Sequence, residues 1–553
     1  MVPGVRCGNR DALNRGCVVL PRRLLNPLPS KQTPALVAKS GSSPAALAIS
    51  AGSVLVLLAA LGIVLFIAER SPLKDDIAWL LYVARRWMAG RGLYTDLIEV
   101  NPPLIIWISA IPVMLANWLH VDVQFVAMPL FVAVAVASAW WTSVLLQTGG
   151  TIFTDRLPVF ALIAAVLLLV PAGDLGQREH LLVAAMLPYL VLFAREMDGR
   201  RTAFTTAAAA GILAGLGCAL KPPYGAVFAV LECLALTGGL RPWRTMPVAA
   251  AAALVLYAGS VAILCPAYFR QAVPMALALY GATDVPLTHL LSGSAALLAE
   301  EAAAIWLLWL RRHQMAEFRS MQASVVFAAA SSLIFLITGK DWFYHQLPAA
   351  ITTILALSLW TASEIRRRGW QPRLPHIVAM ASLAVVCVSC VQRIEPAIAE
   401  AAAPGKTVEA HLERILRAEH AKSYVAFSEW LALGFPVVNE TGVAWASRFD
   451  SMWALQGEVW RSRFDPAGAR NWPVVRWIAG DFIAGCPDIV AVDVVGGTDY
   501  IKILSDGDRD FARVWQHYQP IAAFDGLVIY RRNKGGCPIV SVADALTSKR
   551  PLP

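Results

Sequence analysis

Residues 45–76 read AALAISAGSVLVLLAALGIVLFIAERSPLKDD, an uncharged apolar run that ends just before a cluster of charged residues. The run at 45–68 exceeds the roughly 20 residues that cross the hydrocarbon core of a bilayer as a helix. At least ten runs of about 16–25 apolar residues recur along the chain, separated by short charged clusters. The sequence therefore predicts an α-helical polytopic membrane protein. A cleaved signal peptide is not expected, because the first run is too long for one.

The composition supports this class. Of 553 residues, 57% are hydrophobic and only 15% are charged, whereas about a quarter are charged in a typical soluble domain. The net charge of +9 does not indicate a nucleic-acid partner, because the basic residues flank apolar runs, as in cytoplasmic loops. These clusters are Arg195, Arg200 and Arg201; Arg241 and Arg244; Arg311 and Arg312; and Arg366, Arg367 and Arg368.

The distribution of basic residues also predicts the topology. Residues 1–44 are basic and rich in Pro and Ser, so we expect a disordered cytoplasmic tail and a first span that ends outside. If all four apolar runs that follow the first span crossed the membrane, the basic loop 195–201 would lie outside, whereas basic loops are expected inside. This conflict disappears if residues 102–118 lie in the outer interface. That location suits the segment, since it is short, begins with two prolines and carries Trp107 and Trp118. We therefore predict about eleven spans, with the chain entering the periplasm near residue 393.

Three regions follow from this topology. We expect the tail at 1–44, a transmembrane domain at 45–392 with its first outer loop at 69–121, and a periplasmic α/β domain at 393–553. Within the last region the patterning predicts strands at 488–495 and 527–532 and a helix at 508–519.

Two of the nine cysteines, Cys486 and Cys537, fall in the exported region. An oxidising compartment permits a disulfide between them. Two unpaired thiols are the alternative.

Ionisable and polar residues gather at the predicted outer ends of the spans. In a membrane protein such residues justify a functional hypothesis. Each also has a structural explanation: Asp75 can cap the following helix, Lys221 can extend along the span end, Arg178 can pair with Glu179, and the aromatic residues can lie at the interface. Because all of these residues are predicted on the outer side of the membrane, we expect them to form one site. Its members are Asp75, Asp76, Arg178, Glu179, His180, Lys221, Lys340, Tyr344 and His345.

This combination suits group transfer from a lipid-linked phosphate. Cationic side chains would neutralise the phosphate at the interface and stabilise it as a leaving group. A carboxylate could take the proton of an incoming hydroxyl, and the adjacency of Asp75 and Asp76 would raise the pKa of one of them. Nucleotide-sugars are cytoplasmic, so a donor that reaches this face has to be a lipid.

The stretch after Asp75 and Asp76, GRGLYTDLIEVNPPLIIW at 90–107, resembles the first outer loop of the GT-C membrane glycosyltransferases. These include the protein O-mannosyltransferases and the aminoarabinose transferases of lipid A. GQREHL at 176–181 and GKDWFYHQLP at 339–348 resemble later outer turns, and the likeness covers about residues 70–400.

The resemblance implies inverting transfer from a polyprenyl-phosphate sugar, with Asp75 as first choice for the base and Asp76 as second. It implies that Arg178, Lys221, Lys340 and His345 bind the lipid phosphate, and that Tyr94 and Asn101 shape the loop. The chain departs from the aminoarabinose-type pattern, which ends a comparable turn with Asp where this chain has Glu179 and His180. It also lacks the WWD motif of oligosaccharyltransferases.

The expected partners are a polyprenyl-phosphate sugar, membrane lipids and an acceptor hydroxyl on an envelope lipid, glycan or protein; no nucleic acid is expected. We expect metal-free catalysis in the bacterial inner membrane, with Mg²⁺ or Mn²⁺ on Asp75, Asp76 and Glu179 as the alternative. A transporter or flippase of lipid-linked saccharide is the competing function, but it predicts internal repeats and charges near the bilayer midplane, which the sequence does not show. A sensor or assembly protein anchored by its spans is a third hypothesis.

Overall fold

The computed structural model describes residues 44–148, 155–312, 318–368 and 373–533. The chain divides into two units, residues 1–47 and 48–553, and nearly all of the described residues belong to the second. The expected tail and Cys537 lie outside the described residues.

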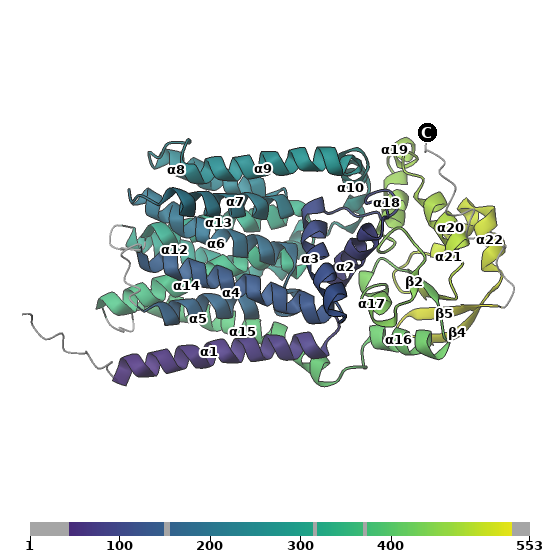
Figure 1. The fold of residues 1–553 in the computed structure, drawn as a ribbon, viewed down its shortest axis with the longest axis horizontal. Helices are drawn as coiled ribbons and strands as arrows, with labels where there is room; N and C mark the ends of the chain where they lie inside the picture. The colour runs from purple at the N-terminus through teal and green to yellow at the C-terminus, as the bar shows by residue number, and fades with distance from the viewer. Residues whose placement is uncertain (1–43, 149–154, 313–317, 369–372, 534–553) are drawn as a thin grey trace, which may run out of the picture. The chain divides into compact units, whose positions relative to one another are not determined.

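The first part of the described chain is helical, and its long helices run side by side in a bundle (Figure 1). Short 3₁₀ or π turns interrupt it at η1 (Ala172–Asp174), η2 (Tyr268–Ala272), η3 (Tyr280–Thr283) and η4 (Phe343–Gln346). The α-helices are α1 (Pro44–Arg70), α2 (Asp75–Met88), α3 (Pro103–Leu119), α4 (Gln124–Thr148), α5 (Arg156–Leu169), α6 (Arg178–Met197), α7 (Phe204–Leu220), α8 (Tyr224–Thr237), α9 (Thr245–Leu264), α10 (Val273–Leu279), α11 (Leu287–Gly293), α12 (Ala295–Arg311), α13 (Phe318–Thr338), α14 (Leu347–Arg368) and α15 (Leu374–Ala402).

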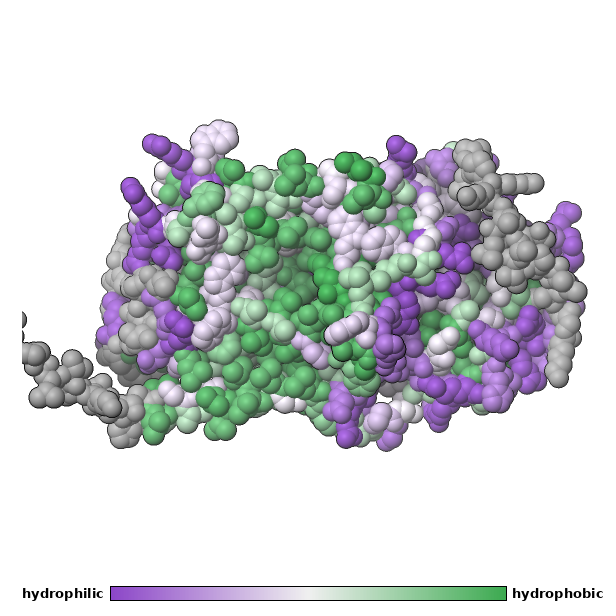
Figure 2. Space-filling view, viewed as in Figure 1, coloured by the Kyte–Doolittle hydropathy of each residue, from purple (hydrophilic) through white to green (hydrophobic). Residues whose placement is uncertain are grey.

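Seven helices of the described residues are long and apolar enough to cross a membrane, or eight if α11 and α12, which meet at a 68° bend, form one span. Hydrophobic side chains cover these helices on the face seen in Figure 2, and hydrophilic ones cover the C-terminal domain. The described residues are therefore mostly helical, with seven or eight candidate membrane spans, which is compatible with a multi-pass membrane protein. The segment 102–118, expected at the interface, forms α3, one of four shorter apolar helices.

Small residues allow α7 and α9 to pack closely. A Cβ on Gly211 would lie 2.3 Å from the carbonyl oxygen of Met246, and one on Gly215 would lie 2.5 Å from that of Ala250. Close approach of this kind is a usual basis of helix association in membranes, where burial of apolar surface does not drive packing.

The C-terminal domain is built on a five-stranded sheet of order β2-β1-β3-β5-β4. β1 is parallel to β2 and β3, and β5 is antiparallel to β3 and β4. The strands are β1 (Ser423–Phe427), β2 (Ala444–Trp445), β3 (Ile489–Asp493), β4 (Tyr518–Phe524) and β5 (Leu527–Arg532). Around them lie α16 (Val408–Ala418), η5 (Leu431–Leu433), α17 (Val437–Thr441), α18 (Trp453–Ser462), α19 (Pro466–Ala469), α20 (Val474–Gly485), α21 (Tyr500–Gly507) and α22 (Arg509–Trp515).

The sequence predicted part of this domain. The strands expected at 488–495 and 527–532 are confirmed as β3 and β5. The helix expected at 508–519 is α22, but its last residues were assigned wrongly, because Tyr518 begins β4 and pairs with β5. α15 continues through the boundary expected at 393 and ends at Ala402; the boundary itself stays a prediction.

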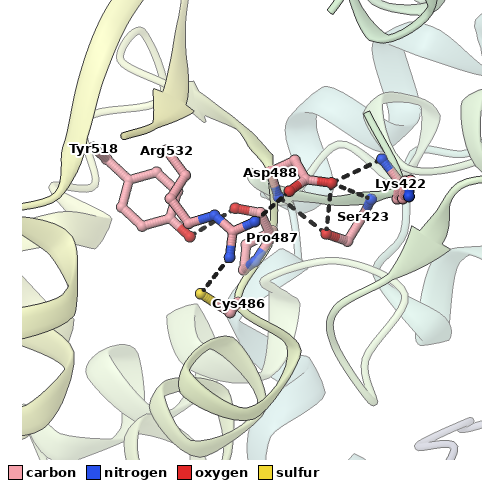
Figure 3. Close-up of polar contacts among 7 residues, drawn as sticks. All are labelled: Lys422, Ser423, Cys486, Pro487, Asp488, Tyr518 and Arg532. Atoms are coloured by element: carbon pink, nitrogen blue, oxygen red, sulfur yellow. Dashed lines mark hydrogen bonds and ion pairs between the residues drawn. The ribbon is translucent and has the colours of Figure 1, made fainter. Parts of the chain in front are cut away.

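The amino ends of β1 and β3 are joined by a set of polar contacts (Figure 3). The carboxylate of Asp488 accepts hydrogen bonds from the backbone N–H of Lys422 at 2.8 Å and of Ser423 at 3.1 Å, and it pairs with Arg532. Arg532 also donates to the sulfur of Cys486 at 2.9 Å. These polar groups serve as hydrogen-bond or ion-pair partners for one another, so we assign this end of the sheet a structural role. Cys486 is disulfide-bonded; its pairing with Cys537 stays a prediction.

The opposite edge, at the carboxyl ends of β1 and β2, contacts the segment 71–102. The rings of Trp79 and Phe435 are 4.9 Å apart, and Asn439 donates to the carbonyl of Ala78 at 3.1 Å. Ligands of open α/β sheets bind outside the carboxyl ends of parallel strands, so this junction is a candidate position for a site.

Candidate functional site

The segment 71–102 is held in shape by Glu99, which is only 3% exposed. Its carboxylate accepts hydrogen bonds from the indole Nε1 of Trp79 and from the backbone N–H of Asn101, the latter at 2.8 Å. Tyr94 takes a positive φ of 70° and donates to the carbonyl of Asn101 at 2.6 Å. Tyr94 and Asn101 thus contribute to the loop structure, as the sequence predicted, whereas the anchor Glu99 was missed.

Asp75 and Asp76 open α2, yet they face different neighbours. Asp75 accepts the backbone N–H of Asp76 at 2.9 Å and lies 3.6 Å from the Lys74 ammonium. The Oδ2 of Asp76 accepts a hydrogen bond from Nε2 of Gln177 at 3.2 Å. Burial, followed by the charge of Asp75, raises the pKa of Asp76. Asp76 is therefore the carboxylate directed at the start of α6.

The start of α6 presents a buried cation whose Nε lacks a partner. Arg178 is 7% exposed, and this Nε finds no hydrogen-bond partner among the described residues. The neighbouring Oε1 of Gln177 and Oε2 of Glu179 are likewise buried without hydrogen bonds to described residues, as is Nδ1 of His345. Buried polar atoms are nearly always hydrogen-bonded, so each exception calls for an explanation. Four such atoms, the Nε of this guanidinium and one atom in each of three other side chains, indicate a site for a polar ligand.

Beside Arg178, three of the residues predicted from sequence form one buried set. The Lys221 ammonium at the end of α7 pairs with the carboxylate of Glu179, and it lies 2.7 Å from Nε2 of His345 in η4. Nε2 of His345 is 3.4 Å from Glu179. The structure therefore brings α6, α7 and η4 together through these side chains.

Aromatic rings extend from this set toward the C-terminal domain. Tyr344 lies with its ring 5.9 Å from the Lys221 ammonium and stacks on Trp342 at 5.9 Å. The ring centroids of Trp342 and Tyr280 are 6.0 Å apart, and those of Tyr280 and Trp453 of α18 are 5.2 Å apart. We call Tyr344, Trp342, Tyr280 and Trp453 the aromatic row.

Two residues predicted for the site have other partners. His180 accepts the N–H of Gly176 on Nδ1 at 3.2 Å, so its Nε2 donates to the carbonyl of Leu167 at 2.9 Å. It therefore links the end of α5 to the start of α6. Lys340 pairs with Asp284 at 2.6 Å and donates to the carbonyl of Tyr280 at 2.6 Å, so it anchors η3.

The residues proposed as an alternative metal site do not fit that role. No group of three or more His, Cys, Asp or Glu side chains within 44–148, 155–312, 318–368 and 373–533 is arranged to hold a metal ion. Glu179 is paired with Lys221, while Asp75 lies beside Lys74. We therefore derive no step through a metal.

Two acidic residues near the site were not predicted as site residues. Asp174 of η1 lines a cavity of about 360 Å³ together with Gln346 and Arg393, and burial raises its pKa to about 7. Asp450, in the C-terminal domain, experiences the charges of Glu99 and Asp76. The sequence places Asp174 with Gln177 among the ionisable and polar residues at the outer ends of the spans, although not in the predicted site, whereas no local pattern marks Asp450.

No protein-family model matches this chain, and no curated protein matches it either. Any function therefore has to rest on the geometry of the site.

Proposed function

We propose that this chain is an inverting glycosyltransferase that moves a sugar from a polyprenyl-phosphate donor to an acceptor hydroxyl. The observation that carries the proposal is the buried guanidinium of Arg178, with its unpartnered Nε, close to the carboxylate of Asp76. A phosphate oxygen is a natural partner for a buried guanidinium, which binds anions through charge-assisted hydrogen bonds. A carboxylate with a raised pKa is suited to accept a proton from a hydroxyl.

The remaining groups have complementary roles in this proposal. Lys221 adds a second positive charge near the phosphate, and Glu179 and His345 orient it by their contacts at its ammonium. Fixed positive charges that face a developing phosphate stabilise it as it departs, because they need no reorganisation during the step. Asp76 then stands as the base, ahead of Asp75. In an inverting transfer the acceptor oxygen attacks the anomeric carbon, the bond to the phosphate oxygen breaks with its electron pair, and the hydroxyl proton goes to Asp76.

The same proposal includes a topology. Counting the seven long apolar helices, the bent pair, and the shorter α5, α7 and α8 as spans gives about eleven crossings, with α3 at the interface. The site and the C-terminal domain would then lie on the periplasmic side of a bacterial inner membrane, with the basic clusters inside.

Binding of the lipid phosphate tests the proposal. The full-length protein in detergent is titrated with decaprenyl phosphate, and the Kd is compared between wild type, Arg178→Gln and Arg270→Gln. Arg270 is an exposed arginine of η2, so its variant controls for loss of a positive charge. We expect Arg178→Gln to weaken binding at least about tenfold, as the loss of a charged hydrogen bond predicts, while Arg270→Gln stays near wild type. Equal binding by wild type and Arg178→Gln would refute the phosphate site.

The reaction is tested separately in cells. Mass analysis of envelope lipids, glycans and proteins in wild-type and deletion strains should show one sugar missing from the deletion strain. An unchanged envelope would exclude the proposed transfer. Flux of a lipid-linked saccharide in proteoliposomes, without transfer, would favour a flippase instead.

A further inference from the structure

The C-terminal domain lies directly against the segment that carries the proposed base. The backbone N–H of Ile98 donates to the carbonyl of Arg448 at 2.8 Å, and Ile98 is bridged to Phe449 in parallel register. This bridge is isolated, and Glu99 and Asp450 are the residues that follow its two partners. The charge of Glu99 acts on Asp450, so one carboxylate from each domain lies near this junction.

The side chain of Asp450 is fixed through only one of its oxygens. Its Oδ1 accepts the backbone N–H of Ser451 at 2.7 Å and the indole Nε1 of Trp453 at 2.9 Å. Its Oδ2 takes no hydrogen bond from any described residue. A carboxylate held by one oxygen has the other oriented and available for a ligand.

The aromatic row connects this position with the phosphate-binding residues. Trp453, which holds Asp450, contacts Tyr280 at 5.2 Å, and the row continues through Trp342 to Tyr344, whose ring is 5.9 Å from the Lys221 ammonium. Asp450 also lies close enough to Asp76 and Glu99 for their charges to act on it. The C-terminal domain thus contributes to the same site as α2 and α6.

A purely structural role does not account for a carboxylate here. An asparagine in place of Asp450 would accept the same two hydrogen bonds on its amide oxygen. It would also avoid a third negative charge beside Asp76 and Glu99, which costs free energy through like-charge repulsion. Perturbed acidic groups that gather in this way are typical of functional sites.

We propose that the C-terminal domain completes the site and that Oδ2 of Asp450 accepts a hydrogen bond from the acceptor, whose neighbouring hydroxyl is deprotonated by Asp76. Two carboxylates on one side of the site match an acceptor with two adjacent hydroxyls, which is the chemistry of a saccharide ring. The acceptor is therefore a glycan or glycolipid sugar. This inference rests on the proposed function, and Asp450 is a positioning residue in it.

The test compares Asp450→Asn, Asp450→Ala and the exposed control Asp506→Asn, each as the full chain in the source organism. The readout is the amount of the envelope saccharide that is modified in wild type and unmodified in the deletion strain. We expect Asp450→Asn to lower it at least about tenfold, similarly to Asp450→Ala, while Asp506→Asn stays at wild-type level. A merely structural role would predict that Asp450→Asn restores modification where Asp450→Ala does not, and that result would overturn the inference.

Binding of decaprenyl phosphate to the purified variants supplies the second readout. Asp450→Asn should bind it within about twofold of wild type, because the residue acts on the acceptor. Loss of decaprenyl phosphate binding in Asp450→Asn would overturn the acceptor role. The acceptor role would also be overturned if the envelope component that wild type modifies proved to be a protein or a sugar-free lipid. An envelope identical in wild type and deletion strain would refute the proposed function itself and the inference with it. Full modification by Asp450→Asn would refute the inference alone.

Discussion

The Oδ2 of Asp76 and the Nε2 of Gln177 are 3.2 Å apart and form a hydrogen bond between α2 and the residue that precedes α6. Because Gln177 is adjacent to Arg178, this contact directs Asp76 toward the guanidinium of the proposed phosphate site. Asp75, one residue earlier, lies beside Lys74 instead. Two adjacent carboxylates of one helix turn therefore have different surroundings, and only one of them faces that site.

This difference predicts unequal effects of neutralising the two residues. Asp76→Asn should lower sugar transfer at least about 100-fold, because removal of a general base typically costs that much. Asp75→Asn should retain activity within a fewfold. The measurement is transfer by membranes that contain equal amounts of each variant, with the exposed Asp122→Asn as control. Loss of transfer in Asp75→Asn with retention in Asp76→Asn would reverse the assignment.

The pH dependence follows from the same pair. A base works only when deprotonated, so transfer should fall as the pH drops through the raised pKa of Asp76, by about tenfold per pH unit. The charge of Asp75 is one cause of that raised pKa, after burial. Asp75→Asn should therefore move the acid limb to lower pH. Asp75, Arg178 and Glu179 are the largest charged contributors at Asp76. The other charged groups that interact with it are Lys74, Glu99, Asp174, Lys221 and Asp450.

The profile of kcat/KM against pH in wild type and Asp75→Asn checks this. A shift of the acid limb to higher pH in Asp75→Asn would contradict the predicted direction of the shift. Identical limbs would show that another group controls the rate.

The pair Glu179–Lys221 predicts a stability effect. Glu179→Gln leaves the Lys221 ammonium, whose side chain is 14% exposed, without its carboxylate, and breaking one half of a buried pair costs about 3–5 kcal/mol. The double variant Glu179→Gln/Lys221→Met removes the charge that is left over and should recover much of the loss. Thermal unfolding in detergent measures both, with exposed Glu69→Gln as the control. A double variant less stable than the single one would contradict the pairing.

Local patterns predicted the elements of this protein better than its site. Apolar runs predicted α1, α4 and α6, because length and hydropathy decide whether a helix can span. They also predicted the mutual approach of Glu179, Lys221 and His345, since all three were expected at one end of the bundle. The sequence ranked Asp75 ahead of Asp76 as the base. The reversed order proposed here depends on the contact of Asp76 with Gln177, which lies about a hundred positions away.

Other features had no local signal. His180 and Lys340 were predicted as site residues. The imidazole of His180 bonds to backbone atoms of Gly176 and Leu167. Lys340 bonds to the carbonyl of Tyr280 and pairs with Asp284, and no local pattern marks any of these partners. Asp450 lies in a domain whose orientation toward α2 is set by tertiary packing. A sequence pattern identifies residues able to do chemistry, whereas the fold determines which of them meet.

Replacing Glu99 tests whether the segment 71–102 depends on one carboxylate. Both of its oxygens accept N–H groups, from Trp79 and from Asn101. Glu99→Gln keeps the shape but points an amide NH₂ at one of these donors, so a buried N–H loses its acceptor. Such a loss costs about 1–3 kcal/mol. Hydrogen exchange should therefore quicken across residues 92–101, with a lower melting temperature, in Glu99→Gln but not in Asp122→Asn. Unchanged exchange in that segment would mean that the contacts with Arg448 and Phe449 hold it without Glu99.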